Sequence, residues 1–233
     1  MGQMITFPSN GSEGQGYLAI PPSGSGPGVV IIQEWWGLND QLREVCDMWA
    51  ADGFTVLAPD LYRGAATSEP DEAGKLMMSL NIEQAAKDMV GAVDYLAAHD
   101  AVVGDGVGVV GFCMGGSLAL WLATLRPERV RAVVTFYGLI GWPATQPDWS
   151  RLSAPVQGHY AENDDSASPA AVAKLANELR ALGKQVEIFT YPGTQHAFTN
   201  HHRPEVYDPD ATALAFERTK AFLHTNLSGS SLS

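Results

Sequence analysis

The order of apolar segments constrains the fold of this chain more than any other feature of its sequence. Short runs rich in β-branched residues alternate with segments in which apolar residues recur at helical spacing. The expected strands cover residues 29–32, 54–58, 107–110, 130–136, a segment near Val156, and 186–191. The expected helices cover residues 42–50, 85–97, 117–125, 172–182 and 211–223. Strands that alternate with helices predict right-handed crossovers, and therefore a doubly wound, mostly parallel sheet with helices on both faces, an α/β fold.

Length and charge narrow the class of protein. A chain of 233 residues suits one domain, expected over 1–227, followed by a small polar tail at 228–233 that frays. A net charge of −12 argues against binding to nucleic acid or to an anionic membrane surface. The chain shows neither a secretory signal pattern nor an apolar stretch of about 20 residues. We therefore expect a cytoplasmic monomer in which Cys46 and Cys113 are free thiols.

Residues that directly follow the strands are the candidates for a functional site. In a doubly wound sheet, ligands bind beyond the carboxyl ends of the strands. Residues 64–81 form a connection that is longer than a tight turn and poor in β-branched residues. We expect this segment to cover one edge of the site as a loop or a short helix.

The strand at 107–110 runs into Gly111-Phe112-Cys113-Met114-Gly115-Gly116 and then into a helix. This is the G-x-S-x-G nucleophile elbow with sulfur in place of oxygen, in which small flanking residues let the strand and the helix approach. The turn points the Met114 N–H toward a developing oxyanion, and the helix N-terminus favours the thiolate form of Cys113. Cys46 lies on the apolar face of its helix and is expected to be structural.

A cysteine nucleophile needs a base and a group that orients the base. In enzymes with such an elbow the acid and the histidine follow the nucleophile in that order. The segment 160–165 offers acids after the strand near Val156, and His196 follows the strand that ends at Tyr191. Asp164 lies 51 residues after Cys113 and 32 residues before His196.

The other histidines fit this order less well. His99 precedes the elbow, and His224 lies in the last expected helix. His201 and His202 are adjacent, which hints at a metal, but no third ligand at helical spacing accompanies them. We therefore interpret them as solvated loop residues and predict no metal and no cofactor.

Several of these segments together resemble the dienelactone hydrolase (carboxymethylenebutenolidase) family of α/β-hydrolases. The resemblance runs in order from about Val29 to Leu223. It rests on Ile31-Ile32-Gln33-Glu34-Trp35-Trp36-Gly37-Leu38-Asn39, Pro59-Asp60-Leu61-Tyr62, Gly108–Gly116, Tyr191-Pro192-Gly193 with His196-Ala197-Phe198, and Glu217-Arg218-Thr219.

The resemblance implies a triad of Cys113, His196 and Asp164, with Asp165 as the alternative acid. It also implies that Glu34 takes part in activating the thiol, and that the Trp35 N–H is the second oxyanion donor beside Met114. Members that act on dienelactone hold its carboxylate with two arginines, for which Arg63 and Arg203 are the candidates. Trp36, Tyr137 and Trp142 are candidate apolar walls, with core packing the preferred reading of Trp142.

The resulting hypothesis is a hydrolase that opens dienelactone, 4-carboxymethylenebut-2-en-4-olide, to a dicarboxylic acid through a thioester on Cys113. Its partner is thus a small ester or lactone. One alternative keeps the site but acts broadly on small aryl or acyl esters and thioesters. The other is a non-catalytic, flavodoxin-like binding module, which the chain fits poorly because its early Gly24-Ser25-Gly26 precedes a strand rather than following it.

Overall fold

The computed structural model describes residues 1–227, and the tail predicted at 228–233 lies outside the described residues. Its strands are β1 (Gln3–Ser9), β2 (Ser12–Ala19), β3 (Gly26–Ile32), β4 (Thr55–Pro59), β5 (Val102–Phe112), β6 (Val130–Phe136), β7 (Val156–Asn163) and β8 (Val186–Gln195). Its helices are α1 (Asp40–Ala51), α2 (Pro70–Met78), α3 (Ile82–Ala97), α4 (Met114–Leu125), α5 (Pro169–Ala181) and α6 (Pro209–Leu227), with short 3-10 helices at Pro143–Thr145 and Trp149–Arg151.

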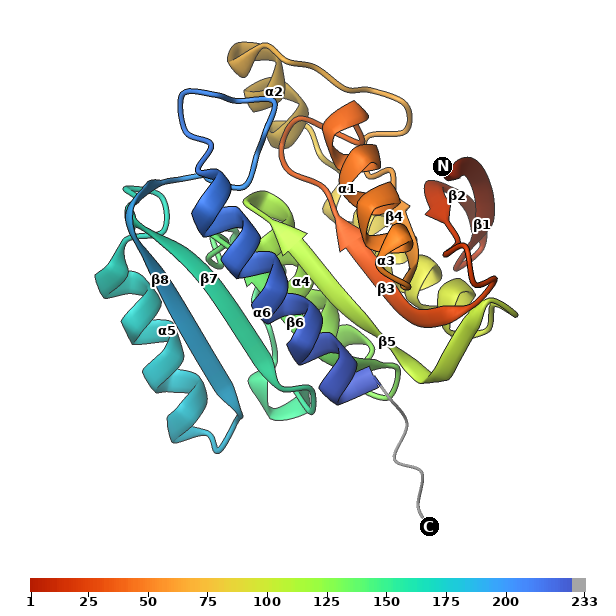
Figure 1. Ribbon diagram of the computed structural model, residues 1–233. Helices are drawn as coiled ribbons and strands as arrows, with labels where there is room; N and C mark the ends of the chain where they lie inside the picture. The colour runs from red at the N-terminus through yellow and green to blue at the C-terminus, as the bar shows by residue number, and fades with distance from the viewer. Residues whose placement is uncertain (228–233) are drawn as a thin grey trace.

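One sheet runs through the whole structure in the order β1-β2-β4-β3-β5-β6-β7-β8 (Figure 1). The strands from β4 to β8 pair in parallel, whereas β1 with β2 and β2 with β4 pair antiparallel. The mostly parallel, doubly wound sheet predicted from the strand–helix alternation is confirmed. All six expected strands and all five expected helices are present.

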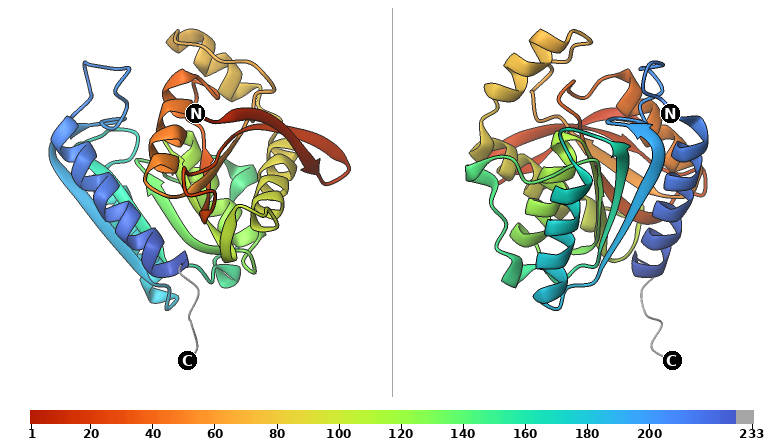
Figure 2. Two further views of the ribbon diagram at one scale, coloured as in Figure 1. Left: turned by 45° about the vertical axis from the view of Figure 1, so that its right-hand side comes forward. Right: turned by 90° about the vertical axis from the view of Figure 1, so that its left-hand side faces the viewer.

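Helices cover both faces of the sheet, as Figure 2 shows. Side chains of α1 and α6 form a core with one face, and side chains of α3 and α4 form a second core with the other. Apolar burial on both faces explains why β3 and β4 read as continuous apolar runs rather than alternating ones. No helix within residues 1–227 is both long and apolar enough to cross a membrane.

The N-terminal hairpin of β1 and β2 was not predicted. Most of β1 is exposed, and Pro8, Gly14 and Gly16 interrupt the period-2 pattern by which a strand is recognised. The hairpin extends the sheet beyond β4 on the side away from β7 and β8.

The connection predicted to cover one edge of the site contains the short helix α2. It lies at the top of the molecule in Figure 1, beside the loop that joins β8 to α6. An isolated bridge between Gly37 and Ala66 and the hydrogen bond from the Thr67 N–H to the Trp36 carbonyl tie this connection to the loop after β3.

Candidate active site

Cys113 occupies a strained turn between β5 and α4. Its backbone has φ 54° and ψ −119°, a conformation that costs a non-glycine residue about 1–3 kcal/mol. The Cys113 N–H donates to the Phe136 carbonyl at 2.9 Å, which holds the turn against β6. The side chain is partly exposed, whereas Cys46 is fully buried in a core between α1 and the sheet. Burial also raises the pKa of the Cys46 thiol, which leaves Cys113 as the candidate nucleophile.

The glycines of the elbow are there because the backbone leaves no room for a side chain. A Cβ on Gly111 would lie 1.9 Å from the Gly115 carbonyl oxygen, and a Cβ on Gly115 would lie 2.3 Å from that of Ile32. A Cβ on Gly116 would lie 3.0 Å from the Gly138 Cα. The start of α4 is therefore packed directly on the ends of β3 and β6.

This packing sets the start of α4, which carries one candidate oxyanion donor, against the end of β3, which precedes the other. Met114 is the first residue of α4, so its N–H has no acceptor within its own helix. Trp35 lies in the turn just after β3, next to the Ile32 and Gln33 carbonyls against which Gly115 packs. The arrangement suits a carbonyl oxygen bound between the Met114 and Trp35 N–H groups.

His196 follows β8 and is paired with Asp164, which follows β7. The distance from His196 Nδ1 to Asp164 Oδ2 is 2.7 Å. The other carboxylate oxygen of Asp164 accepts the N–H groups of Ser166 and Ala167 at 2.8 and 2.9 Å. Asp165 is exposed. Of the two acids that the sequence left open, the structure brings Asp164 to the histidine.

Ion pairing governs the protonation of this pair. Burial alone would lower the pKa of His196, but the hydrogen bonds with Asp164 and with Cys113 outweigh it and raise that pKa to about 10. Burial alone would raise the pKa of Asp164, and the hydrogen bond with His196 lowers it instead. At neutral pH the arrangement favours an imidazolium paired with the Asp164 carboxylate.

Glu34 lies buried behind this group. One carboxylate oxygen accepts the Tyr137 hydroxyl and the other accepts the Asn200 side-chain amide, both at 3.0 Å. The Tyr137 hydroxyl also lies 2.7 Å from Thr199 Oγ1, and its ring packs edge-on against His196 at 4.9 Å. Burial raises the pKa of Glu34, although the two hydrogen bonds oppose this shift.

Tyr137 was predicted to form an apolar wall of the substrate pocket, but the structure buries its side chain beside Glu34. The residue is 1% exposed, and its hydroxyl orients Glu34. Thr199 and Asn200 were not singled out from the sequence. The sequence could have indicated them by their position, because they lie two and three residues after Ala197, in the same loop as His196.

Trp36 and Arg203 line a cavity of about 270 Å³ together with Asn200 and His202. The Arg203 guanidinium lies 5.6 Å from the centre of the Trp36 ring, and its Nε donates to Glu205 at 2.8 Å. Attraction from Arg203 also lowers the pKa of Glu34, after the larger effects of burial, the two hydrogen bonds and His196. Trp142 packs, partly buried, against the core of α3 and α4, as its preferred reading predicted.

Arg63 does not join this group among the described contacts. Its guanidinium donates to both oxygens of the buried Asp88, at 3.2 and 3.0 Å, and lies near the Glu13 carbonyl at 3.4 Å. A buried carboxylate supplied by α3 thus engages the arginine that the sequence suggested for a substrate carboxylate.

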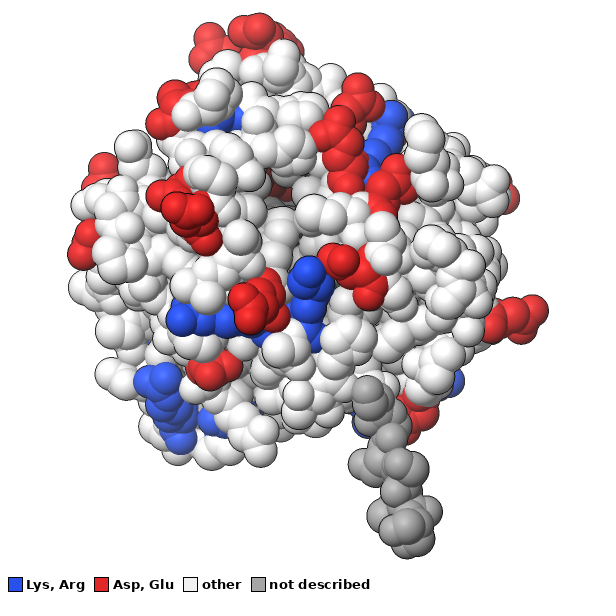
Figure 3. All heavy atoms as spheres, in the orientation of Figure 1, with Lys and Arg blue, Asp and Glu red and all other residues white. Residues whose placement is uncertain are grey.

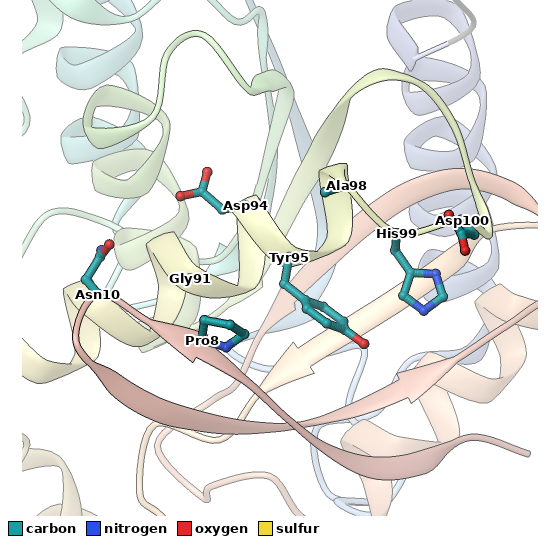
Figure 4. Close-up of a pocket in the computed structure, with 8 residues that line it drawn as sticks. All are labelled: Pro8, Asn10, Gly91, Asp94, Tyr95, Ala98, His99 and Asp100. Atoms are coloured by element: carbon teal, nitrogen blue, oxygen red, sulfur yellow. The ribbon is translucent and has the colours of Figure 1, made fainter.

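A second hollow, of about 520 Å³, lies between the N-terminal hairpin and α3 (Figure 4). It is lined by Pro8, Asn10, Gly91, Asp94, Tyr95, Ala98, His99 and Asp100, and none of these belongs to the triad group. Figure 3 shows acidic side chains spread over the face on which α1 and α6 lie. Away from the triad, Glu44, His201 and His202 each bring one possible metal-ligand atom within 4.8 Å of the others.

Comparisons with known proteins point to one family. Residues 15–227 match the family described as the dienelactone hydrolase family. A protein of Aquifex pyrophilus named Protein usf is 38% identical over 95% of this chain and 97% of its own length. An Aquifex aeolicus protein, whose name marks it as a candidate carboxymethylenebutenolidase, is 35% identical over 97% of this chain and all of its own length. The crystal structure of a candidate dienelactone hydrolase from Klebsiella pneumoniae is 27% identical, with a TM-score of 0.85 over 96% of this chain and 98% of that one.

Proposed function

The chain belongs to the dienelactone hydrolase family and is a hydrolase that acts on ester or lactone bonds, and from this premise we propose that it opens dienelactone through a thioester on Cys113. The observation that carries the proposal is the hydrogen bond of 2.7 Å between His196 and Asp164. Asp164 and Cys113 both raise the pKa of His196. A thiol at a strained strand-to-helix turn, a histidine and a buried acid are the three parts that nucleophilic acyl transfer requires.

Glu34 is the base that takes the thiol proton in the first step. The hydrogen bond with Asp164 raises the pKa of His196 and favours its imidazolium form, which leaves Glu34 as the group that accepts this proton. Burial raises the pKa of Glu34, which makes its carboxylate a stronger base. Tyr137 and Asn200 each donate to one of its oxygens, and each oxygen keeps a lone pair that can accept the thiol proton.

The Cys113 thiolate then attacks the lactone carbonyl, and the Met114 and Trp35 N–H groups bind the oxyanion. The ring C–O bond breaks, and the His196 imidazolium gives its proton to the departing oxygen. This leaves an open-chain acyl group on sulfur and a neutral His196. Asp164 stabilises the cation before this transfer and holds the ring in place after it.

Water releases the product in the second half of the reaction. His196 takes a proton from water, the resulting hydroxide attacks the thioester, and the carbon–sulfur bond breaks to give the free acid. The departing thiolate recovers its proton from Glu34. The sum is one lactone and one water converted to one ring-opened dicarboxylic acid.

The test compares Cys113→Ala and Cys113→Ser with Cys46→Ala as the matched control. The rates of hydrolysis of cis- and trans-dienelactone should fall by on the order of 10³-fold or more in Cys113→Ala. They should stay near wild type in Cys46→Ala, because that thiol is buried away from the elbow. Undiminished hydrolysis by Cys113→Ala would refute the mechanism.

A broad esterase or thioesterase activity is the second candidate, and the surroundings of Arg63 favour it. With Arg63 bound to Asp88, Arg203 is the remaining predicted arginine for a substrate carboxylate, and the net charge of −12 does not attract an anion. A neutral aryl or acyl ester needs neither arginine. Hydrolysis of p-nitrophenyl acetate without turnover of either dienelactone isomer would select this candidate.

A further inference from the structure

Glu44, His201 and His202 form a surface cluster that the triad does not use. The Nε2 atoms of His201 and His202 lie 2.6 and 2.9 Å from the same Glu44 oxygen, Oε2. Glu44 is on the exposed side of α1, and the two histidines are in the loop between β8 and α6, so the fold joins positions 157 and 158 residues apart. The sequence offered no third ligand at helical spacing for the adjacent histidines, and the structure supplies one from a distant helix.

The geometry points to a divalent transition-metal site, and we propose that Glu44, His201 and His202 bind Zn²⁺. Two imidazole nitrogens and one carboxylate oxygen make a donor set that Zn²⁺ uses with an additional water ligand. Two nitrogen donors disfavour Ca²⁺ and Mg²⁺, which take oxygen ligands. The three ligand atoms lie within 4.8 Å of one another, so one ion can contact all three after small side-chain rotations.

The consecutive histidines reach the same ion because of the turn that precedes them. The Asn200 N–H donates to the Ala197 carbonyl, and the His202 N–H donates to the Asn200 side-chain oxygen at 3.1 Å. The His201 and His202 rings stand nearly perpendicular, at 85°, with their centres 4.7 Å apart. Both Nε2 atoms thus face α1 from one side.

The ion would fasten the loop between β8 and α6 to α1. This loop also carries Asn200, whose side-chain amide holds Glu34, and His202 and Arg203 line the cavity beside Trp36. Figure 1 shows the loop rising above the carboxyl ends of the strands. Zinc binding should therefore slow opening of the loop, measured as slower amide hydrogen exchange across residues 199–207.

The test is a titration of the full chain carrying Cys113→Ser with ZnCl₂, followed by calorimetry and by thermal unfolding. The serine removes the thiol as a competing zinc ligand, so its background isolates the proposed site. We expect one zinc per chain and, at about 100 times the Kd, a rise in Tm on the order of 5 °C. His201→Ala, His202→Ala and Glu44→Gln should each weaken binding by on the order of 10-fold or more.

His224→Ala is the matched control, since this histidine is also exposed but lies on α6 and should leave the zinc affinity unchanged. The three cluster residues are exposed, so their variants should keep the Tm of the parent chain when zinc is absent. Failure of the Cys113→Ser chain to bind zinc would overturn the proposal. So would binding that survives Glu44→Gln and His201→Ala undiminished. None of these readouts depends on hydrolysis, so they stand apart from the test of the thioester mechanism.

Discussion

Replacing Gly115 by alanine should damage both folding and catalysis, and the size of each effect follows from the contact between α4 and β3. The new Cβ would lie 2.3 and 2.4 Å from the Ile32 and Gln33 carbonyl oxygens, where an ordinary contact is at least 3.4 Å. Because these are backbone atoms, the start of α4 must move by about 1 Å. Overpacking of this kind costs about 1–3 kcal/mol, which lowers Tm by roughly 3–10 °C in a chain of this length.

The same movement carries the Met114 N–H and Cys113 away from Trp35. A misplacement of about 1 Å costs on the order of 100-fold in rate, so kcat/KM for p-nitrophenyl acetate should fall by about that factor. Gly74→Ala is the control: this glycine lies in α2 with no atom within 4 Å of its built Cβ, so alanine should raise stability by about 1 kcal/mol and leave the rate unchanged. A Gly115→Ala chain with wild-type Tm and rate would refute the close packing of α4 on β3.

Three further changes test the electrostatics of the site and of the core. Asp164→Asn should lower the pKa of His196 from about 10 and reduce kcat by on the order of 10³–10⁴-fold, with pH-dependent kinetics and NMR titration of the ring as the measurements. Tyr137→Phe removes a hydrogen bond that lowers the pKa of Glu34, so the acidic limb of the pH–rate profile should move to higher pH, and an unmoved limb would contradict the role given to Glu34. The pKa of His159 is lowered to about 3 by burial and, to a smaller extent, by a nearby cation, so folding keeps the ring neutral. The free energy of unfolding should therefore decline as pH falls from 6.5 toward 3, by at most about 5 kcal/mol from this residue, and His159→Gln should flatten that part of the curve in urea titrations.

The sequence predicts those parts of the fold in which apolar residues follow one clear period. The buried strands from β3 to β7 and the helices α1, α3 and α4 were found in this way, whereas α2 lies in a segment expected as a loop or a short helix. The hairpin of β1 and β2 was missed because most of β1 is exposed and β2 lacks a clear period-2 pattern of apolar residues, and because its pairing with β4 depends on contacts distant in sequence. The alternation of apolar and polar residues is weak when only part of one face of a strand packs against the core.

The site residues also differ in whether neighbouring residues in the sequence or distant contacts identify them. The elbow is a local steric requirement, so its glycines mark Cys113 directly. Asp164 and Asp165 differ in sequence by one position, and only the turn that sets the Ser166 and Ala167 N–H groups on Asp164 separates them. Arg63 pairs with a carboxylate on α3 that is distant in sequence, and no local sequence pattern predicts this contact.

The spread of the proposed triad along the chain also bears on when a newly made molecule becomes reactive. Cys113 follows β5 near the middle of the chain, whereas Asp164 and His196 follow β7 and β8, and β8 pairs only with β7 among the described strands. His196 leaves the ribosome about 80 residues after Cys113, roughly 4 to 16 s later at ordinary rates of synthesis. During that interval the proposed nucleophile lacks the pair of His196 and Asp164 beside it. On the proposed mechanism, a growing chain therefore stays inactive until the edge strand β8 has paired with β7.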